Sequence, residues 1–285
     1  MDWNELGAVA PAALAPARAQ AHWAAQVISA AGETLLRHVP DTSHTAMAWD
    51  AGLAALVGFP IPGSDACRVA LRVRDLTLLL VDAGGKAGSE LPLGGRTLAQ
   101  AYEWAAQAVR TRTRGGHARA LVHPGYELPP HPIAGGGRFE ADPGALTELA
   151  RWYANADLEL RAFATRTPGA SAVLCWPHHF DIASLIAVET DAAGEATKTI
   201  GVGLSPGDGF IAEPYWYVNH GPEAVDPELP VLAAGEWFTN GWMGAVLRGS
   251  ELAVAGGAAE QRARLRAYLA SAVEASRNLL TSPSP

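Results

Sequence analysis

Two histidines and an aspartate stand at the start of an apolar run in the stretch CWPHHFDIASLIAVE, residues 175–189. Side chains two residues apart on a strand share a face, so a strand that includes His179 and Asp181 places them together. The later segment EPYWYV predicts a hairpin partner for this strand. We expect its first residue, Glu213, to approach the face that carries His179 and Asp181.

One imidazole and two carboxylates are the side-chain types that bind metal ions. The set of His179, Asp181 and Glu213 would suit zinc, manganese, iron or nickel, with open positions left for water. His220, which follows the same predicted hairpin strand, is a further candidate ligand. Without a metal, a carboxylate could instead orient His179 as a general base. A third interpretation is that the three groups only satisfy the hydrogen bonds of a strand end.

Aromatic and polar residues near the hairpin predict a second kind of site. Asp208 lies in the turn of GLSPGDG, and two tyrosines and two tryptophans lie in or beyond the following strand. Apolar walls with a few polar groups are typical of small-molecule sites. The candidate ligand-binding residues are Asp208, Tyr215, Tyr217, Trp237 and Trp242, although packing against the sheet would also explain the aromatic ones.

Composition excludes several classes of protein. The chain has 285 residues, of which 49% are hydrophobic and 18% are charged, and this composition is typical of a globular protein. Its net charge of −8 argues against nucleic-acid binding. The strongest apolar run, LTLLLV, is too short to span a membrane. Two cysteines in apolar contexts and no evident signal peptide favour a cytoplasmic location. Nothing in the sequence indicates an oligomeric state. HExxH, P-loop and dinucleotide fingerprints are lacking.

The elements that must position these residues follow from hydrophobic spacing. Apolar positions three and four apart predict a helix through Trp23 and Leu35 and helices over 97–112, 145–164 and 259–280. Asp142 is placed to cap the third of these. Segments rich in β-forming residues, separated by Gly, Pro and Asp, predict strands at 44–50, 53–61, 67–73, 76–82, 171–177, 179–189, 198–204 and 210–218.

The helices and strands fall into two similar series, each a helix, about four strands and a helix. Trp49 and Trp176 end the first strand of each series, and their offset is close to that between Val69 and Ile200. Short connections favour antiparallel pairing. We therefore predict an α+β fold of two related halves, packed as one globular unit. The predicted parts are an N-terminal half at 1–114, a Gly/Pro/His-rich linker at 115–144, and a C-terminal half at 145–285 with an insertion at 219–250.

The motifs WPHHFDIA and GxSPGDxxxxEPYWYV resemble those of a family of uncharacterised bacterial proteins that carry a WPxHFD[IL]A strand followed by GxSPGD and EPYxYV. The resemblance is clear over residues 173–250, and it places His179, Asp181, Asp208 and Glu213 in one unit. It implies no activity.

Three hypotheses follow. In the first, a polar, metal-binding cleft in the C-terminal half acts, if the protein is an enzyme, in metal-dependent hydrolysis. In the second, the protein is a non-catalytic small-molecule binder that uses the Trp and Tyr side chains. In the third, it is a structural or scaffold protein whose polar residues are all hydrogen-bonded to the chain.

Overall fold

The computed structural model describes residues 2–114, 120–222 and 228–281. It divides the chain into two compact units. What we call the N-terminal unit comprises residues 14–150 and 174–180, and the C-terminal unit comprises residues 1–13, 151–173 and 181–285. The predicted class, a mixture of helices with antiparallel sheet, is confirmed.

This division differs from the predicted one at residues 1–13 and 174–180, and residues 120–150 also fall in the N-terminal unit. Residues 1–13 join the C-terminal unit, where the Gln261 side chain accepts hydrogen bonds from Trp3 Nε1 at 3.3 Å and from the Leu6 N–H at 2.9 Å. Residues 174–180 join the N-terminal unit, where Cys175 pairs with Met47. Parts of the predicted linker and insertion, 115–119 and 223–227, lie outside the described residues.

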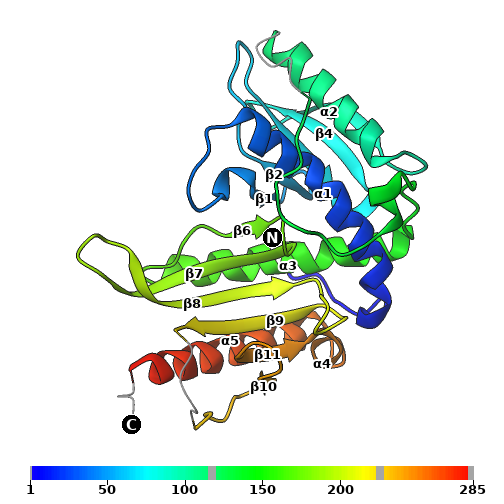
Figure 1. Ribbon diagram of the computed structural model, residues 1–285. Coiled ribbons are helices and arrows are strands. Elements are labelled where there is room, and N and C mark those ends of the chain that lie inside the picture. Colours follow the sequence, from blue (N-terminus) through cyan, green and yellow to red (C-terminus); the bar gives the residue numbers. More distant parts are fainter. Residues whose placement is uncertain (1, 115–119, 223–227, 282–285) are drawn as a thin grey trace. The chain divides into compact units, whose positions relative to one another are not determined.

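An antiparallel sheet in the order β6-β1-β2-β3-β4-β5 forms the centre of the N-terminal unit. Helices α1 (Ala15–Leu35) and α2 (Leu98–Thr113) pack on β3 and on each other (Figure 1). A capping box of Thr97 and Gln100 starts α2. The strands are β1 (Met47–Asp50), β2 (Ala55–Gly58), β3 (Cys67–Arg72), β4 (Thr77–Asp82), β5 (Ala87–Pro92) and β6 (Leu174–Trp176).

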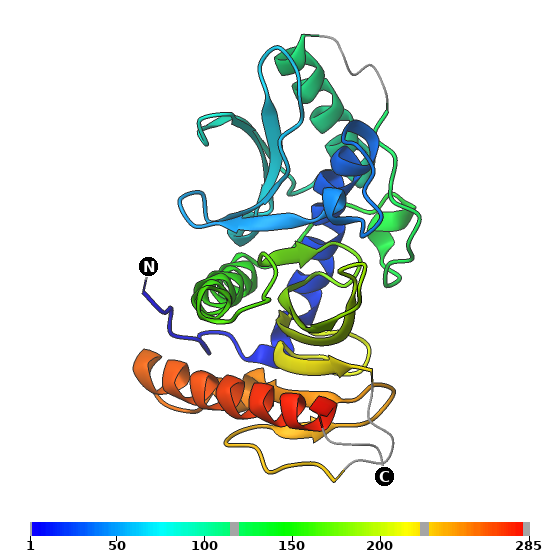
Figure 2. The same cartoon turned by 90° about the vertical axis from the view of Figure 1, so that its left-hand side faces the viewer.

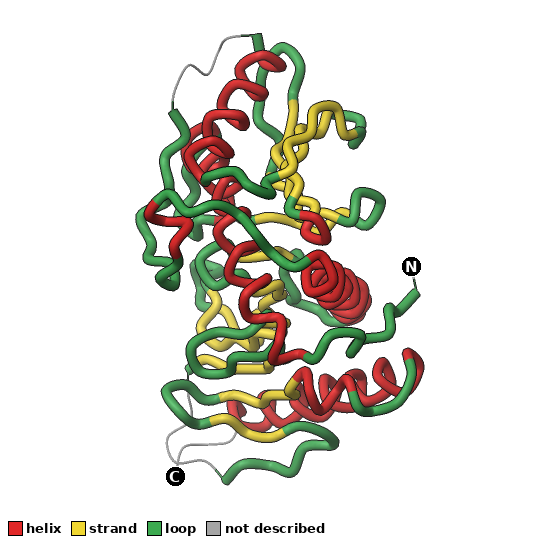
Figure 3. The backbone as a smooth tube through the Cα atoms, turned by 90° about the vertical axis from the view of Figure 1, so that its right-hand side faces the viewer, coloured by secondary structure: helices red, strands yellow, loops and turns green. Residues whose placement is uncertain are grey.

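In the C-terminal unit, strands pair antiparallel in the order β7-β8-β9-β11-β10. Helix α5 (Ala258–Thr281) packs along one face of these strands (Figures 2 and 3). The Tyr268 hydroxyl donates a hydrogen bond to the carbonyl of Ala245, at 2.7 Å, and so fixes α5 on the sheet. The other elements are β7 (Asp181–Thr190), β8 (Ala196–Ser205), β9 (Tyr215–Gly221), β10 (Glu236–Phe238), β11 (Gly244–Arg248) and α4 (Gly249–Ala253).

The long helices confirm the spacing analysis. Asp142 accepts a hydrogen bond from the Ala145 N–H at 2.7 Å and caps α3 (Pro143–Arg166), as predicted. The division between the units falls inside α3, after Ala150. The predicted apolar stripe of α5 is buried at every position, from Leu265 to Leu280. Among the described residues, none of the helices has the length and apolarity to cross a membrane.

Three short strands were not predicted. β5 has mostly exposed side chains, so it lacks the apolar alternation that marks a half-buried strand. β10 and β11 lie within the segment 219–250, which the sequence predicts as an irregular insertion.

Candidate functional site

The two histidines of the WPHHFD motif lie in a turn and not on a strand. Residues 177–180 link β6 to β7, and the Phe180 N–H donates a hydrogen bond to the Trp176 carbonyl at 2.7 Å. Phe180 has φ +61°, a left-handed conformation that breaks strand geometry. The prediction that strand alternation unites His179 with Asp181 is therefore wrong. His179 is exposed in this turn, and Asp181 is the first residue of β7.

Asp181 binds a tyrosine of β9. The Tyr217 hydroxyl donates a short hydrogen bond, 2.5 Å, to Asp181 Oδ2. Strand β8 lies between the two, with Gly203 opposite both Ala183 and Tyr217. A Cβ at Gly203 would lie 2.6 Å from the Tyr217 hydroxyl oxygen. The absent side chain of Gly203 thus leaves the space in which the tyrosine reaches across β8 to the carboxylate.

Glu213 does not take part in this contact. It precedes β9, and its carboxylate accepts hydrogen bonds from the Ser250 N–H at 2.6 Å and the Ser250 hydroxyl at 2.9 Å. Ser250 lies in the first turn of α4, where free N–H groups favour a negative charge. Glu213 therefore stabilises a helix start, and the prediction that it faces the His179–Asp181 pair is wrong.

Asp208 holds the turn before β9, as its place in the SPGD motif suggests. Its Oδ1 accepts hydrogen bonds from the N–H groups of Phe210 and Ile211, both at 2.8 Å. Its Oδ2 accepts one from the Tyr215 hydroxyl at 2.6 Å. Burial, followed by this bond to Asp208, raises the pKa of Tyr215. Two neighbouring tyrosines of β9 are thus each bound to an aspartate.

Aromatic rings gather on this part of the C-terminal unit. The Tyr215 ring centroid lies 6.3 Å from those of Tyr217 and Trp242, and Phe238 lies 5.0 Å from Trp242. Phe210 continues the group at 6.3 Å from Phe238 and is 58% exposed. We call Tyr215, Tyr217, Phe238, Trp242 and Phe210 the aromatic group. Trp237, also a candidate, instead donates a hydrogen bond to the Pro230 carbonyl at 2.7 Å.

His220 occupies a different face of β9. It pairs with Ile200 and is buried, as are Trp216 and Val218 at the alternate positions, so it lies opposite the tyrosine face. No group of three or more His, Cys, Asp or Glu side chains able to hold a metal ion occurs in the part of the chain that the structure describes. The predicted ligands His179, Asp181, Glu213 and His220 are therefore not gathered into such a group.

A cluster of histidines in the N-terminal unit was not recognised from the sequence. His178 lies 4.4 Å from His179 and 5.9 Å from Tyr126, measured between ring centroids, and Tyr126 lies 5.3 Å from His123. His123, His178 and Tyr126 are not among the predicted site residues. The only available signal was the adjacency of His178 and His179, because His123 stands in the Gly/Pro-rich segment more than 50 positions earlier.

The turn that carries His178 and His179 is held through its main chain. The Pro177 carbonyl accepts hydrogen bonds from His22 Nε2 at 2.8 Å and Gln26 Nε2 at 2.9 Å. Because a carbonyl only accepts, His22 carries its proton on Nε2. The Gln26 side chain also accepts a hydrogen bond from the Tyr126 hydroxyl at 2.6 Å. The Phe180 ring stacks on His22, with a centroid distance of 5.1 Å.

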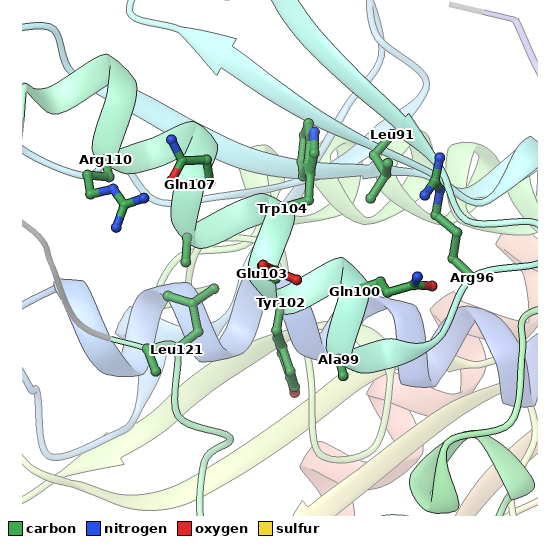
Figure 4. A pocket seen from close by; sticks show the side chains of 12 residues that line it. Leu91, Arg96, Ala99, Gln100, Tyr102, Glu103, Trp104, Gln107, Arg110 and Leu121 are labelled. Atoms are coloured by element: carbon green, nitrogen blue, oxygen red, sulfur yellow. The ribbon is translucent and has the colours of Figure 1, made fainter.

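A hollow with a volume of about 930 Å³ lies along α2 (Figure 4). Neither the motif residues nor the histidines line it, so pocket size and candidate chemistry point to different places. Most of the side chains that line this hollow belong to α2. Its lining includes Arg96, Gln100, Tyr102, Trp104, Gln107 and Arg110.

Comparison with known proteins gives no relative from which a role could be transferred. No family model, curated protein or solved structure matches the chain. The resemblance of the WPHHFDIA and GxSPGD motifs to a bacterial family therefore stays a prediction, and function has to be argued from the geometry.

Proposed function

We propose that the protein binds a small organic cation, such as an alkylated ammonium group, at the aromatic group of the C-terminal unit. The observation that carries this proposal is the hydrogen bonding of two tyrosines, on the same face of β9, to two aspartates. Tyr217 donates to Asp181 and Tyr215 donates to Asp208, at 2.5 and 2.6 Å. A phenol that donates to a carboxylate gains electron density in its ring, and electron-rich rings attract cations.

The surrounding rings support the same chemistry. The Trp242 ring centroid lies 6.3 Å from that of Tyr215, and the Phe238 centroid lies 5.0 Å from that of Trp242. Several aromatic faces around one point are the usual recognition device for quaternary ammonium groups. Tyr217, Phe238 and Trp242 are each partly exposed, which leaves ring surface for a ligand. The net charge of −8 favours the approach of a cation.

Choline and its uncharged analogue 3,3-dimethyl-1-butanol, which has the same shape, give a direct test. Isothermal titration should show choline binding that is about tenfold or more tighter than that of the alcohol. Trp242→Leu should remove this difference, whereas Trp104→Leu, on α2 of the N-terminal unit, should preserve it. Equal binding of the two compounds, or no binding of choline, would contradict the proposal.

We also propose that the two predicted halves, 1–114 and 145–285, arose by duplication of one helix–meander–helix ancestor. The first strands of the two predicted series, β1 and β6, pair antiparallel through Met47 and Cys175. Each series then continues as a meander, β2-β3-β4 in one and β7-β8-β9 in the other. A crystal structure tests this: superposing β1–β4 on β6–β9 should bring α1 onto α3 and α2 onto α5. Helices on opposite faces would contradict duplication.

A further inference from the structure

We propose that His178 and His179, together with His123, form an anion-binding site in the N-terminal unit, which accepts a carboxylate or a phosphate-type oxyanion. The site is separate from the aromatic group and takes a ligand of opposite charge. Four observations carry it: a rigidly held turn, ring nitrogens without hydrogen bonds, basic surroundings and an aromatic border.

The turn is fixed independently of the histidines that it presents. Its anchors are the Pro177 carbonyl, bound by His22 and Gln26, and the Phe180 ring, which is fully buried. Gln26 is also fully buried and His22 is only 7% exposed. Buried polar side chains are stabilising only when they are hydrogen-bonded, so this network specifies one position for the turn. The histidines that follow Pro177 are thereby pre-organised for a ligand.

The histidine rings retain unused hydrogen-bonding capacity. Ring contacts engage His178 and His179, yet neither makes a hydrogen bond to another described residue. His123 Nε2 is buried and has no hydrogen-bond partner among the described residues. An imidazole offers one donor when neutral and two when protonated. A ligand with several acceptor oxygens would satisfy all three rings.

The electrostatic surroundings favour an anion over a cation. The charged groups that act on His22 are Arg18, His179 and His178, which are all basic. Glu33 is the one acid that acts on the Tyr126 phenol, and it is bound to His44 at 3.1 Å. Charge-assisted hydrogen bonds from imidazolium to an oxyanion are stronger than neutral ones. Trp23 and Trp176 border the histidine row, 6.5 and 6.3 Å from His123 and His178.

Binding should be coupled to proton uptake. Burial lowers the pKa of His178, and the neighbouring His179 lowers it further, so the empty site disfavours the charged form. An anion between the rings reverses that preference and raises the pKa of His178. The pair faces His22 of α1 and Tyr126 of the connecting segment. The titratable and charged groups next to these two are Arg18 and Glu33 of α1, Tyr102 of α2, His123 of the connecting segment and Cys175 of β6.

The test uses sulfate and acetate, because neither anion titrates between about pH 6 and pH 8. Isothermal titration of the full chain should show saturable binding of at least one of these anions. Tighter binding of sulfate would indicate a phosphate-type ligand, and tighter binding of acetate would indicate a carboxylate ligand. For each proton taken up, affinity should rise by up to about tenfold per pH unit as the pH falls. The double variant His178→Gln/His179→Gln should weaken binding about tenfold or more.

His38→Gln is the matched control, because His38 is exposed and adjoins another histidine, His44, at 4.9 Å. It should bind the anion within about twofold of the native chain. Unchanged thermal unfolding, together with retained choline binding if that is established, verifies the fold of each variant. His179→Gln alone, at an exposed position, serves if the double variant does not fold. Absence of saturable binding at about pH 6, or equal binding by native and His-substituted chains, would overturn the proposal.

Discussion

His22 donates its Nε2 hydrogen to the Pro177 carbonyl at 2.8 Å, across 155 positions of sequence. The imidazole is only 7% exposed, and this burial, with Arg18, His179 and His178 nearby, lowers its pKa to about 4. A buried neutral histidine of this kind makes folding sensitive to acid, and that sensitivity can be measured.

Acidification should destabilise the protein through His22. Its folded pKa of about 4 lies below the unfolded value of 6.5, so the unfolded state binds the proton more readily. The stabilisation is fully present above pH 6.5 and is lost as the pH falls towards about 4, with a total of about 3 kcal/mol. Urea unfolding at about pH 7.5 and pH 4.5 measures this loss. His22→Gln, which retains a donor for Pro177, should reduce it, whereas His38→Gln should not; an unchanged loss in His22→Gln would contradict the assignment.

Removal of the Glu213 carboxylate should destabilise the C-terminal unit. Glu213→Ala leaves the Ser250 N–H at the start of α4 without its acceptor, for a loss of about 1 kcal/mol in the free energy of unfolding. Glu195→Ala, at an exposed position in the β7–β8 hairpin, should stay within about 0.5 kcal/mol. Urea unfolding of both variants separates them, and equal stability would show that the Glu213–Ser250 contact contributes nothing.

Gly203→Ala should be destabilising because the new Cβ would lie 2.6 Å from the Tyr217 hydroxyl oxygen and 2.8 Å from the Ala183 Cβ. Overpacking of this kind costs about 1–3 kcal/mol. Tyr217→Ala removes one of the two obstacles, so the double variant should lose less stability than the sum of the single variants. Gly209→Ala, whose added Cβ would have no atom within 4 Å, is the control. Strict additivity of the two substitutions would contradict the predicted contact.

Alkaline pH should unfold the chain through its buried tyrosines. Burial raises the pKa of Tyr102, Tyr126, Tyr215 and Tyr268 above the ordinary value of 10. A raised pKa means that these neutral phenols stabilise the fold fully below pH 10, and that this stabilisation is lost at higher pH. Tyrosinate absorbance at about 295 nm should therefore show that four of the six tyrosines ionise only when the chain unfolds, as followed by the loss of far-UV circular dichroism. Six independent titrations near pH 10 in a folded chain would exclude this.

The helices could be predicted because their signals are local. The burial of Leu265 to Leu280 on α5 follows from spacing alone, and so does the cap that Asp142 places on α3. Both features depend on residues within a few positions of one another. The strand partners do not: the sequence predicts EPYWYV as the hairpin partner of the strand at 179–189, whereas β8 lies between β7 and β9 and pairs with both.

The candidate site could be predicted only in part, because its geometry depends on distant contacts and on one backbone angle. The left-handed conformation of Phe180 ends the alternation that would join His179 to Asp181, and phenylalanine gives no sequence signal for it. Glu213 meets Ser250 across 37 positions, and neither residue type indicates the other. The association of His123 with the WPHHFD turn depends on tertiary packing in the same way.

Because His22 and Gln26 bind the main-chain carbonyl of Pro177, the position of the turn does not depend on which side chains it carries. Every residue offers a carbonyl, so His178 and His179 can be exchanged without loss of either anchoring bond. Substitutions at 178 and 179, whether in evolution or by protein engineering, can therefore change the side chains of this turn while its backbone stays in place.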